Sequence, residues 1–321
     1  MATFDPYIGR REAIGLGIEA TPGTAVAPQV WLRWLDQPLN PRTEVLENES
    51  AMGVVDRVND SEVATAWAEG TPGGKVTDNA VGYLLLGIFG DVSTGTVSSG
   101  IYPHTFSVNQ SSIPRTLTFV RSGPAGSYRH PYATVDTFEL TAEEKGWVQV
   151  SCAVKARTGV PSEETPAIAP EKEFTSKNIV LKLADTVGNL SGAAPVKARS
   201  LTLTMERPSE QFDALGTNNE PEFDRGTFEA RGEFVVRHTT DQYETDMLEN
   251  TIKALSIALT NDTTSLTFTA SKVRFREIDT DRSRDNVVTQ TVQFFCEFDT
   301  ATNKSIEAVL RNATPTYAPA A

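Results

Sequence analysis

Apolar and polar residues alternate along much of this chain. In residues 199–206, Leu201, Leu203 and Met205 alternate with serine, threonine and glutamate. Further along, one face of residues 227–234 carries Phe228, Ala230, Gly232 and Phe234, and the other carries Thr227, Glu229, Arg231 and Glu233. A period of two residues is typical of a strand with one buried face. We therefore predict a sheet with one face in a core and one in water.

Other segments extend this prediction. Strands are expected at residues 31–35, 62–76, 134–140, 147–154, 222–237, 272–278 and 287–298. Two segments have helical spacing instead. Residues 78–88 form one apolar stripe that Gly90 ends, and residues 241–259 form another, which begins with Asp241 and Glu244 spaced as in a capping box. Both helices are expected to pack on the buried face of the sheet.

The chain carries similar segments twice in the same order. Residues 148–154 resemble residues 292–298, and each segment holds one of the two cysteines, Cys152 and Cys296. Residues 41–44, 70–71 and 117–119 likewise resemble residues 208–210, 226–227 and 266–268. A period near 150 residues is the size of a domain rather than of a solenoid repeat. We predict two tandem copies of one module; the alternative is a chance likeness among threonine-rich strands.

The predicted fold is mainly β, with two tandem β-sandwich or barrel modules, each with one flanking α-helix. An N-terminal arm (1–30), interrupted by glycine and proline, precedes the first module (31–157). A linker (158–174) leads to the second module (175–311), and a tail (312–321) follows. Residues 44–60 are polar and acidic, which favours a long loop or a hairpin extension. Its shorter counterpart is expected at residues 209–221.

Composition fits a folded chain with a core, because 39% of the residues are hydrophobic and 22% are charged. The net charge of −13 argues against a basic cradle for nucleic acid. The chain shows no apolar run long enough to cross a membrane and no signal-peptide pattern at its start, so we expect it to stay in the cytosol. The two cysteines are expected to be buried and unpaired.

No pattern in the chain predicts catalysis. His104, His130 and His238 stand apart from one another. Residues 279–285 begin with the spacing of a calcium loop but lack its glycine and its closing glutamate. Because phosphate-loop and nucleophile-elbow motifs are also missing, no catalytic, cofactor-binding or metal-binding residue is assigned, and an enzyme is not expected.

Residues 15–28 (GLGIEATPGTAVAP) resemble the opening of the major tail (tail tube) proteins of long-tailed bacteriophages. The resemblance continues at residues 31–35, 47–53 and 68–70, and it reaches the second predicted module only in outline. It implies a β-sandwich or barrel with a flanking helix, whose copies pack side by side into a tube around a lumen. The usual chain of that family has one module and forms six-membered rings. Two modules therefore imply trimeric, pseudo-hexameric rings, with hexameric rings as the alternative.

The resemblance also implies a function. The chain is expected to be a structural subunit of a virion tail, assembled in the bacterial host cytoplasm, whose stacked rings conduct genome DNA during ejection. Its implied partners are itself, the tape measure protein and tail terminator or tip proteins, with no membrane partner and no specific DNA binding. An acidic lumen would let DNA slide, and the candidate lumen residues are Glu62, Thr202, Thr204, Glu206, Glu229 and Glu233. Candidate contacts between rings are Glu44, Glu47, Glu49, Met52 and Asp56.

Two other classes remain open. One is a tube-like secretion-system protein of the same fold, which would usually be a single short module. The other is a tandem β-sandwich adhesin or carbohydrate-binding protein, which should display exposed aromatic rings. The four tryptophans are instead expected in the core, at Trp31, Trp34, Trp67 and Trp147.

Overall fold

The sheet of this protein folds around one apolar helix, α1 (Ala80–Phe89). The computed structural model describes residues 6–36, 39–216 and 221–319, and all ten residues of α1 are buried. A helix that is apolar on every side is stable only inside a core. It ends where Gly90 adopts a φ of 85°, a left-handed conformation that favours glycine. The helix predicted at residues 78–88 is therefore confirmed.

Strands make up most of the remaining structure, which confirms a mainly β fold. The N-terminal half contains β1 (Ala13–Ile18), β2 (Val30–Leu32), β3 (Trp34–Asp36), β4 (Leu39–Asn48), β5 (Asp60–Gly70), β6 (Gly73–Lys75), β7 (Gly90–Thr94), β8 (Tyr102–Val108), β9 (Leu117–Gly123), β10 (Gly126–Glu143), β11 (Gln149–Arg157) and β12 (Val160–Ser162). Short 3-10 turns lie at Gly9–Arg11 and Val187–Asn189.

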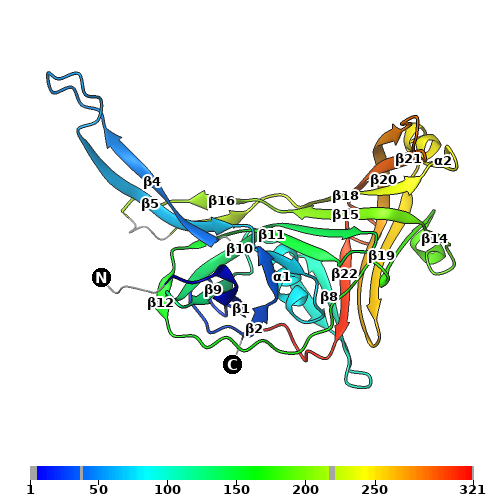
Figure 1. Cartoon of the computed structure of the whole chain (residues 1–321), viewed down its shortest axis with the longest axis horizontal. Coiled ribbons are helices and arrows are strands. Elements are labelled where there is room, and N and C mark those ends of the chain that lie inside the picture. Colours follow the sequence, from blue (N-terminus) through cyan, green and yellow to red (C-terminus); the bar gives the residue numbers. More distant parts are fainter. Residues whose placement is uncertain (1–5, 37–38, 217–220, 320–321) are drawn as a thin grey trace.

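The C-terminal half contains a short helix, α2 (Gln242–Leu248), and ten strands. These are β13 (Ile179–Ala184), β14 (Pro195–Val196), β15 (Ala198–Glu206), β16 (Ser209–Phe212), β17 (Glu222–Arg225), β18 (Glu229–Arg237), β19 (Lys253–Asn261), β20 (Thr264–Asp281), β21 (Thr289–Cys296) and β22 (Glu307–Asn312). In Figure 1, α1 lies among the strands of the N-terminal half, and α2 lies at the far right of the molecule.

The two halves share one branched antiparallel sheet. In the N-terminal half the strands pair in the order β4–β5–β11–β10–β9–β1–β2. In the C-terminal half the order is β15–β18–β21–β20–β19–β13–β14. β10 pairs directly with β15, and β22 pairs with both β20 and β8. The expected pair of separate sandwiches is therefore not what the structure shows.

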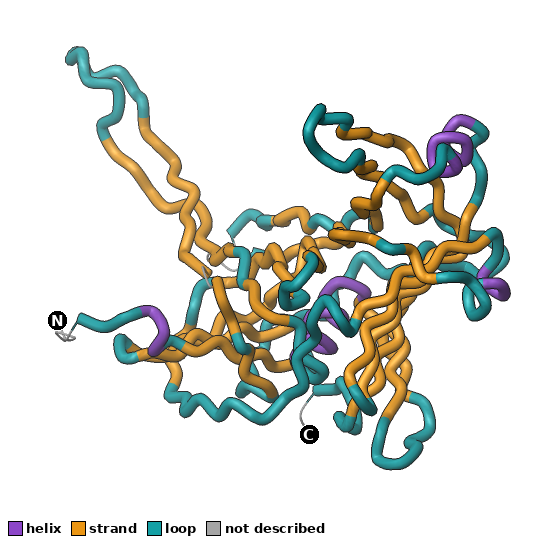
Figure 2. Tube along the Cα trace, turned by 45° about the vertical axis from the view of Figure 1, so that its right-hand side comes forward, coloured by secondary structure: helices purple, strands orange, loops and turns teal. Residues whose placement is uncertain are grey.

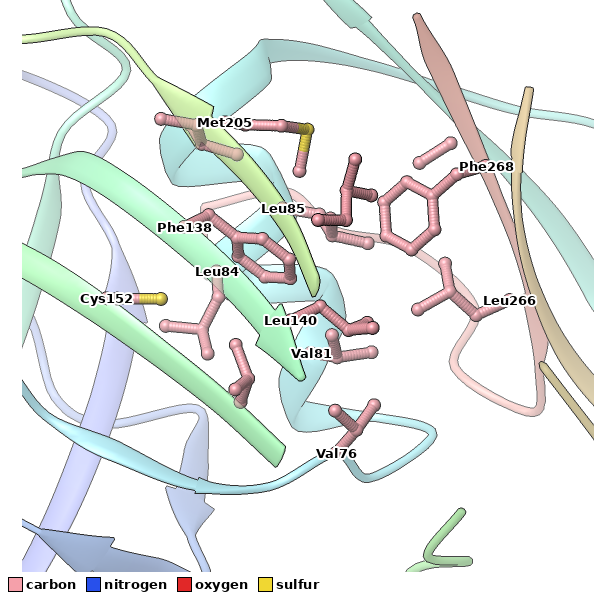
Figure 3. Close-up of a cluster of buried hydrophobic side chains, with 14 of the residues drawn as sticks. Val76, Val81, Leu84, Leu85, Phe138, Leu140, Cys152, Met205, Leu266 and Phe268 are labelled. Atoms are coloured by element: carbon pink, nitrogen blue, oxygen red, sulfur yellow. The ribbon is translucent and has the colours of Figure 1, made fainter. Parts of the chain in front are cut away.

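A single hydrophobic core spans both halves. Figure 3 shows Val81, Leu84 and Leu85 of α1 close to Phe138 of β10 and Phe268 of β20. The rings of Phe138 and Phe268 lie 6.4 Å apart between centroids, although they come from different halves of the chain. The apolar sheet faces merge because β10 and β15 are hydrogen-bonded neighbours.

The helix predicted at residues 241–259 is wrong beyond its first turns. α2 ends at Leu248, and Asn250 takes a left-handed φ of 55°. The following apolar residues, Leu255, Ile257 and Leu259, are buried at every second position of β19. Asp241 makes no side-chain cap hydrogen bond, so the predicted capping box is not formed. The spacing of the apolar residues in this segment fits both a helix and a strand. The segment forms a strand because it pairs with β13 on one side and with β20 on the other.

The N-terminal arm and the C-terminal tail are more ordered than predicted. Residues 13–18 form β1, a fully buried strand between β2 and β9, and residues 1–5 lie outside the described part. Gly15 and Gly17 are required there because a Cβ on either would collide with Pro28 or Ala27. In the tail, Tyr317 is only 1% exposed. The predicted linker runs beside the body, where β12 pairs with β10 and Glu164 binds Arg129 at 2.6 Å.

The repeated sequence segments do not occupy equivalent places in the sheet. Cys152 lies opposite Phe138, whereas Cys296 lies opposite Val273. The segment 117–119 begins β9, but its predicted counterpart 266–268 lies inside β20. Both cysteines are nonetheless buried and free, as predicted. A repeat in this chain must therefore be sought in strand pairing rather than in these segments.

Gly82 offers a test of how α1 and the tail fit together. Alanine normally stabilises a helix interior by about 1 kcal/mol relative to glycine. A Cβ at Gly82 would instead overlap the ring of Tyr317, whose hydroxyl donates to the Asn79 carbonyl oxygen at 2.9 Å. Gly82→Ala is expected to lower the free energy of unfolding by about 1–3 kcal/mol, measured by urea denaturation. In a Tyr317→Ala background the same change should be neutral or stabilising; equal losses in both backgrounds would contradict this packing.

Candidate assembly surfaces

One face of the sheet is polar and open to solvent. The lumen candidates Thr202, Thr204 and Glu206 lie on β15, and Glu229 and Glu233 lie on β18. The ladder places Thr204 opposite Arg231, Thr202 opposite Glu233 and Glu206 opposite Glu229, so these side chains share one face. The opposite face carries Leu201, Leu203, Met205, Ala230 and Phe234, all of which are buried. The predicted division into a core face and a water face is confirmed for these strands.

Arg231 sits among the carboxylates of this polar face. Its guanidinium binds Glu206 at 2.5 Å and Glu229 at 3.0 Å, and these hydrogen bonds raise the pKa of Arg231. Glu233 is exposed, whereas Thr204 is only 9% exposed. On β15 and β18 this face therefore carries three carboxylates, Glu206, Glu229 and Glu233, and two guanidinium groups, Arg231 and Arg237.

Glu62 does not lie with the other lumen candidates. It belongs to the part of β5 that pairs with the outer end of β4, opposite Leu46. These two strands form a hairpin, here called the β4–β5 arm (residues 39–70), which projects from the body (Figures 1 and 2). The hairpin extension predicted for residues 44–60 is thus observed. All five candidate inter-ring residues lie on it and are exposed, namely Glu44, Glu47, Glu49, Met52 and Asp56.

The arm exposes apolar side chains as well as acidic ones. Seven valine, leucine and methionine residues are more than two-fifths exposed, and they are Val45, Leu46, Met52, Val54, Val55, Val58 and Val63. The hydrogen bonds of its tip, such as Asn59 Nδ2 to the Ser50 carbonyl oxygen at 2.7 Å, join residues of the tip to one another. Exposed apolar surface of this kind is typical of regions that contact another molecule.

A second hairpin contrasts with the arm. β16 and β17 continue the β15–β18 pair beyond the sheet, and this hairpin lies on the N-terminal half of the same chain. Ser209 Oγ donates to Asp136 Oδ1 at 2.7 Å, and Lys155 Nζ donates to the Ser209 carbonyl oxygen at 3.1 Å. The ring of Phe223 packs on Tyr132, with centroids 5.9 Å apart. This hairpin fastens one half of the molecule to the other.

Arg225 is the buried cation of that contact. Its guanidinium donates to the carbonyl oxygens of Val135 at 2.6 Å, of Arg207 at 3.0 Å and of Gly87 at the end of α1. Burial lowers the pKa of Arg225 to about 10. Arg225 is not among the residues predicted from the sequence, although its position carries a signal, because it shares a strand face with the buried Phe223. An arginine at an apolar-face position indicates a buried polar contact.

The buried ionisable groups hold the structure rather than form a reactive cluster. Glu19 accepts from Thr116 Oγ1, Thr118 Oγ1 and the Tyr132 N–H at 2.6, 2.8 and 2.9 Å. Within the described ranges, no group of three or more histidine, cysteine, aspartate or glutamate side chains could hold a metal ion. No helix of that part of the chain is long and apolar enough to cross a membrane.

The tryptophans are only partly in the core. Trp31 is 6% exposed, whereas Trp147 is 44% exposed and has the Lys75 ammonium 4.1 Å from its ring centroid. The expectation that all four lie in the core is therefore confirmed for Trp31, holds only in part for the half-buried Trp34 and Trp67, and is wrong for Trp147.

His130 predicts a dependence of stability on pH. Burial lowers its pKa to about 4, so the folded imidazole stays neutral while the unfolded chain binds a proton below about 6.5. The free energy of unfolding should therefore fall by about 1 kcal/mol per pH unit between pH 6.5 and 4. His130→Gln should make this slope shallower, as measured by urea denaturation at several pH values. An unchanged slope in the variant would show that His130 does not cause it.

Comparison with known proteins identifies the family of this chain. A family model described as phage tail tube protein matches residues 9–303. No curated protein matches the chain. Among solved structures, a chain of the 6-fold symmetrised anti-feeding prophage baseplate, determined by cryo-EM, is similar at 12% identity and a TM-score of 0.31. That match covers 42% of this chain and 95% of the other. Since the family model spans most of the sequence, this chain belongs to the phage tail tube protein family, as its residues 15–28 predicted.

Proposed function

We propose that three copies of this chain close into a ring, that the rings stack into the tube of a virion tail, and that genome DNA passes through the lumen. The observation that carries this proposal is the β10–β15 ladder, which joins the two halves through backbone hydrogen bonds. Among the described strands, β4 pairs only with β5, and residues 277–281 of β20 pair only with β21. A sheet built this way can continue from one copy to the next. Ring closure then pairs these two edges with each other.

The repeated pairing order supports two modules in each chain. The order β4–β5–β11–β10–β9–β1 has the same succession of connections as β15–β18–β21–β20–β19–β13. In each set one helix follows the second strand, α1 after β5 and β6, and α2 after β18. Three chains therefore supply the six modules that single-module relatives supply with six chains.

The polar face of β15 and β18 is proposed to line the lumen. Duplex DNA carries one charge about every 1.7 Å along its axis, so a basic wall would hold it at many points. Glu206, Glu229 and Glu233 outnumber Arg231 and Arg237 on this face and give it net negative charge. Such a wall lets DNA slide past without specific binding.

The tip of the β4–β5 arm is proposed to contact the next ring. Its exposed valines and Met52 would lose their contact with water there, which makes stacking favourable. The ends of the stack would meet the tape measure protein and the tail terminator or tip proteins. Assembly would take place in the cytoplasm of the bacterial host.

Removing the tip tests its role in stacking. A variant lacking residues 44–60 should stay folded, because the side-chain hydrogen bonds seen at the tip in the described residues join tip residues to one another. It should form single rings without tubes in electron micrographs. The full-length triple variant Met52→Ser, Val54→Ser, Val55→Ser is the matched control for apolar contact, and it should shorten the tubes as well. Tubes of normal length from the deletion variant would remove the tip from the inter-ring contact.

Accessibility and charge reversal test the lumen. A cysteine replacing Glu233 should react with a bulky maleimide in isolated rings but not within long sealed tubes. Glu229→Lys with Glu233→Lys should preserve tubes and slow genome release from particles by about tenfold or more, because each lysine attracts phosphate. Glu229→Gln with Glu233→Gln is the control without positive charge. Rapid labelling of residue 233 along intact tubes would place this face outside and reject the lumen assignment.

A further inference from the structure

The geometry points to a defined junction between copies of this chain: residues 39–42 of β4 pair, antiparallel, with residues 277–280 of β20 in the next copy. Arg42 then lies opposite Glu277, and Asn40 lies opposite Asp279. This inference rests on the proposed self-assembly into rings, and it adds the strand edges and the register. The junction between the two halves of a single chain serves as its template.

The template is the ladder between β10 and β15. It runs from Thr137 opposite Glu206 to Glu143 opposite Ser200. The Arg207 N–H donates to the Asp136 carbonyl oxygen at 2.8 Å at one end of the ladder. Core residues meet on one face, such as Phe138 opposite Met205, and polar residues meet on the other, such as Glu139 opposite Thr204.

β20 repeats β10 in register, including its irregularities. Both strands are 18 residues long. β10 departs from regular pairing with β9 after His130 and with β11 after Val135; β20 departs from regular pairing with β19 after Ala270 and with β21 after Phe275. The two irregularities are equally spaced in the two strands. Because bulges fix how a strand bends and which way its side chains point, Thr137 of β10 corresponds to Glu277 of β20.

β4 repeats β15 by the same reasoning. In the N-terminal half, Leu39 lies opposite Gly70, which lies opposite Val154 of β11. In the C-terminal half, Leu203 lies opposite Gly232, which lies opposite Phe294 of β21. Val154 lies opposite Val135, and Phe294 lies opposite Phe275. Val135 and Phe275 each come directly before the second irregularity of β10 and β20, so Val154 and Phe294 are equivalent. Leu39 therefore corresponds to Leu203, and Arg42 to Glu206.

The two halves differ in the strand that pairs with the outer edge of β10 and of β20. The edge of β10 at residues 137–143 is covered by β15, but no described strand pairs with the corresponding edge of β20 at residues 277–281. β5 is likewise the one described strand that pairs with β4. The two open edges lie at opposite ends of the molecule (Figures 1 and 2). Two different edges at opposite ends suit a head-to-tail contact, which can close into a ring.

The side chains at these edges are complementary in the inferred register. Arg42 is half exposed and binds Glu69 at 2.9 Å within its own chain, and Glu277 is exposed. Opposite charges directly across two strands stabilise their pairing. On the core face, Pro41 meets Ile278, as Met205 meets Phe138. Pro41 has no N–H to donate, which is tolerated at a strand edge, so this junction has one hydrogen bond fewer than its template.

Disulfide formation tests the register. Asn40 and Asp279 are exposed, and they correspond to Thr204 and Glu139 of the template. Hydrogen-bonded and non-hydrogen-bonded pairs alternate along an antiparallel ladder. Since Arg207 and Asp136 are hydrogen-bonded, so are Met205 and Phe138, and the pair between them and Leu203–Leu140, Thr204 with Glu139, is not. Such pairs have Cα atoms about 4.5 Å apart, within the range for a disulfide. The variant Asn40→Cys, Asp279→Cys should give, after oxidation, covalently closed rings of three chains on non-reducing gels. Burial raises the pKa of Cys152, and of Cys296 to about 12, so the native thiols stay unreactive.

A slipped pair is the matched control. Thr280 lies one residue further and faces the other side of the strand, so Asn40→Cys, Thr280→Cys should cross-link at least tenfold less. Rings that form from the first variant without cross-linking, or that cross-link equally in the slipped variant, would overturn the register while leaving the tube function intact. A wild-type chain that forms no rings at all would overturn the proposed function itself.

Charge exchange gives an independent readout without oxidation. Arg42→Glu should reduce the yield of rings at least tenfold, because it places two carboxylates opposite each other. Arg42→Glu with Glu277→Arg should restore the yield. The Arg42–Glu69 ion pair is lost in both variants, so rescue reports only the contact between chains. Equal loss of rings in both variants would overturn the pairing of these two residues.

Discussion

The need to pair backbone groups along strand edges governs this structure. An unpaired edge presents a row of N–H and C=O groups that bind another strand. Within the chain, β10 satisfies its outer edge with β15, and β20 and β8 share β22. These ladders explain why two similar halves merge into one sheet and one core. Among the described strands, the edges of β4 and of the outer part of β20 are left without the partner that the equivalent edges of β15 and β10 have.

The core follows from this arrangement of strands. Once β10 and β15 are neighbours, their apolar faces form one surface, and α1 is enclosed beneath it with every residue buried. The buried cation Arg225 fits the same arrangement, because it satisfies carbonyl oxygens at the end of α1 and on β10 while the β16–β17 hairpin lies over them. A hydrogen-bonded buried cation is costly to disturb. The hairpin is therefore held in one position on the N-terminal half.

Strict alternation made part of this fold predictable. β15 and β18 lie where apolar and polar residues alternate, and α1 lies where the apolar stripe ends at a glycine. The polar face of the candidate lumen could be predicted for the same reason. β19 could not be predicted, because its leucines also fit a helical period. β1 was missed because Gly15 and Gly17 look like breaks in a strand until their close neighbours Pro28 and Ala27 are known. The repeat was predicted from similar sequence segments, which align Cys152 with Cys296. The strand pairing also repeats, but it aligns Val154 with Phe294 instead.

The pairing of β22 with β8 has a consequence for how the chain folds during synthesis. β8 leaves the ribosome early, but its partner strand, Glu307–Asn312, is made much later. Until then β8 has one unpaired edge, and the cover that Tyr317 gives to α1 is missing. Contacts between such distant segments slow folding, since a long loop must close before they form. The N-terminal half therefore stays incomplete until residues 307–317 have left the ribosome, and until then the nascent chain is most exposed to mispairing with other copies.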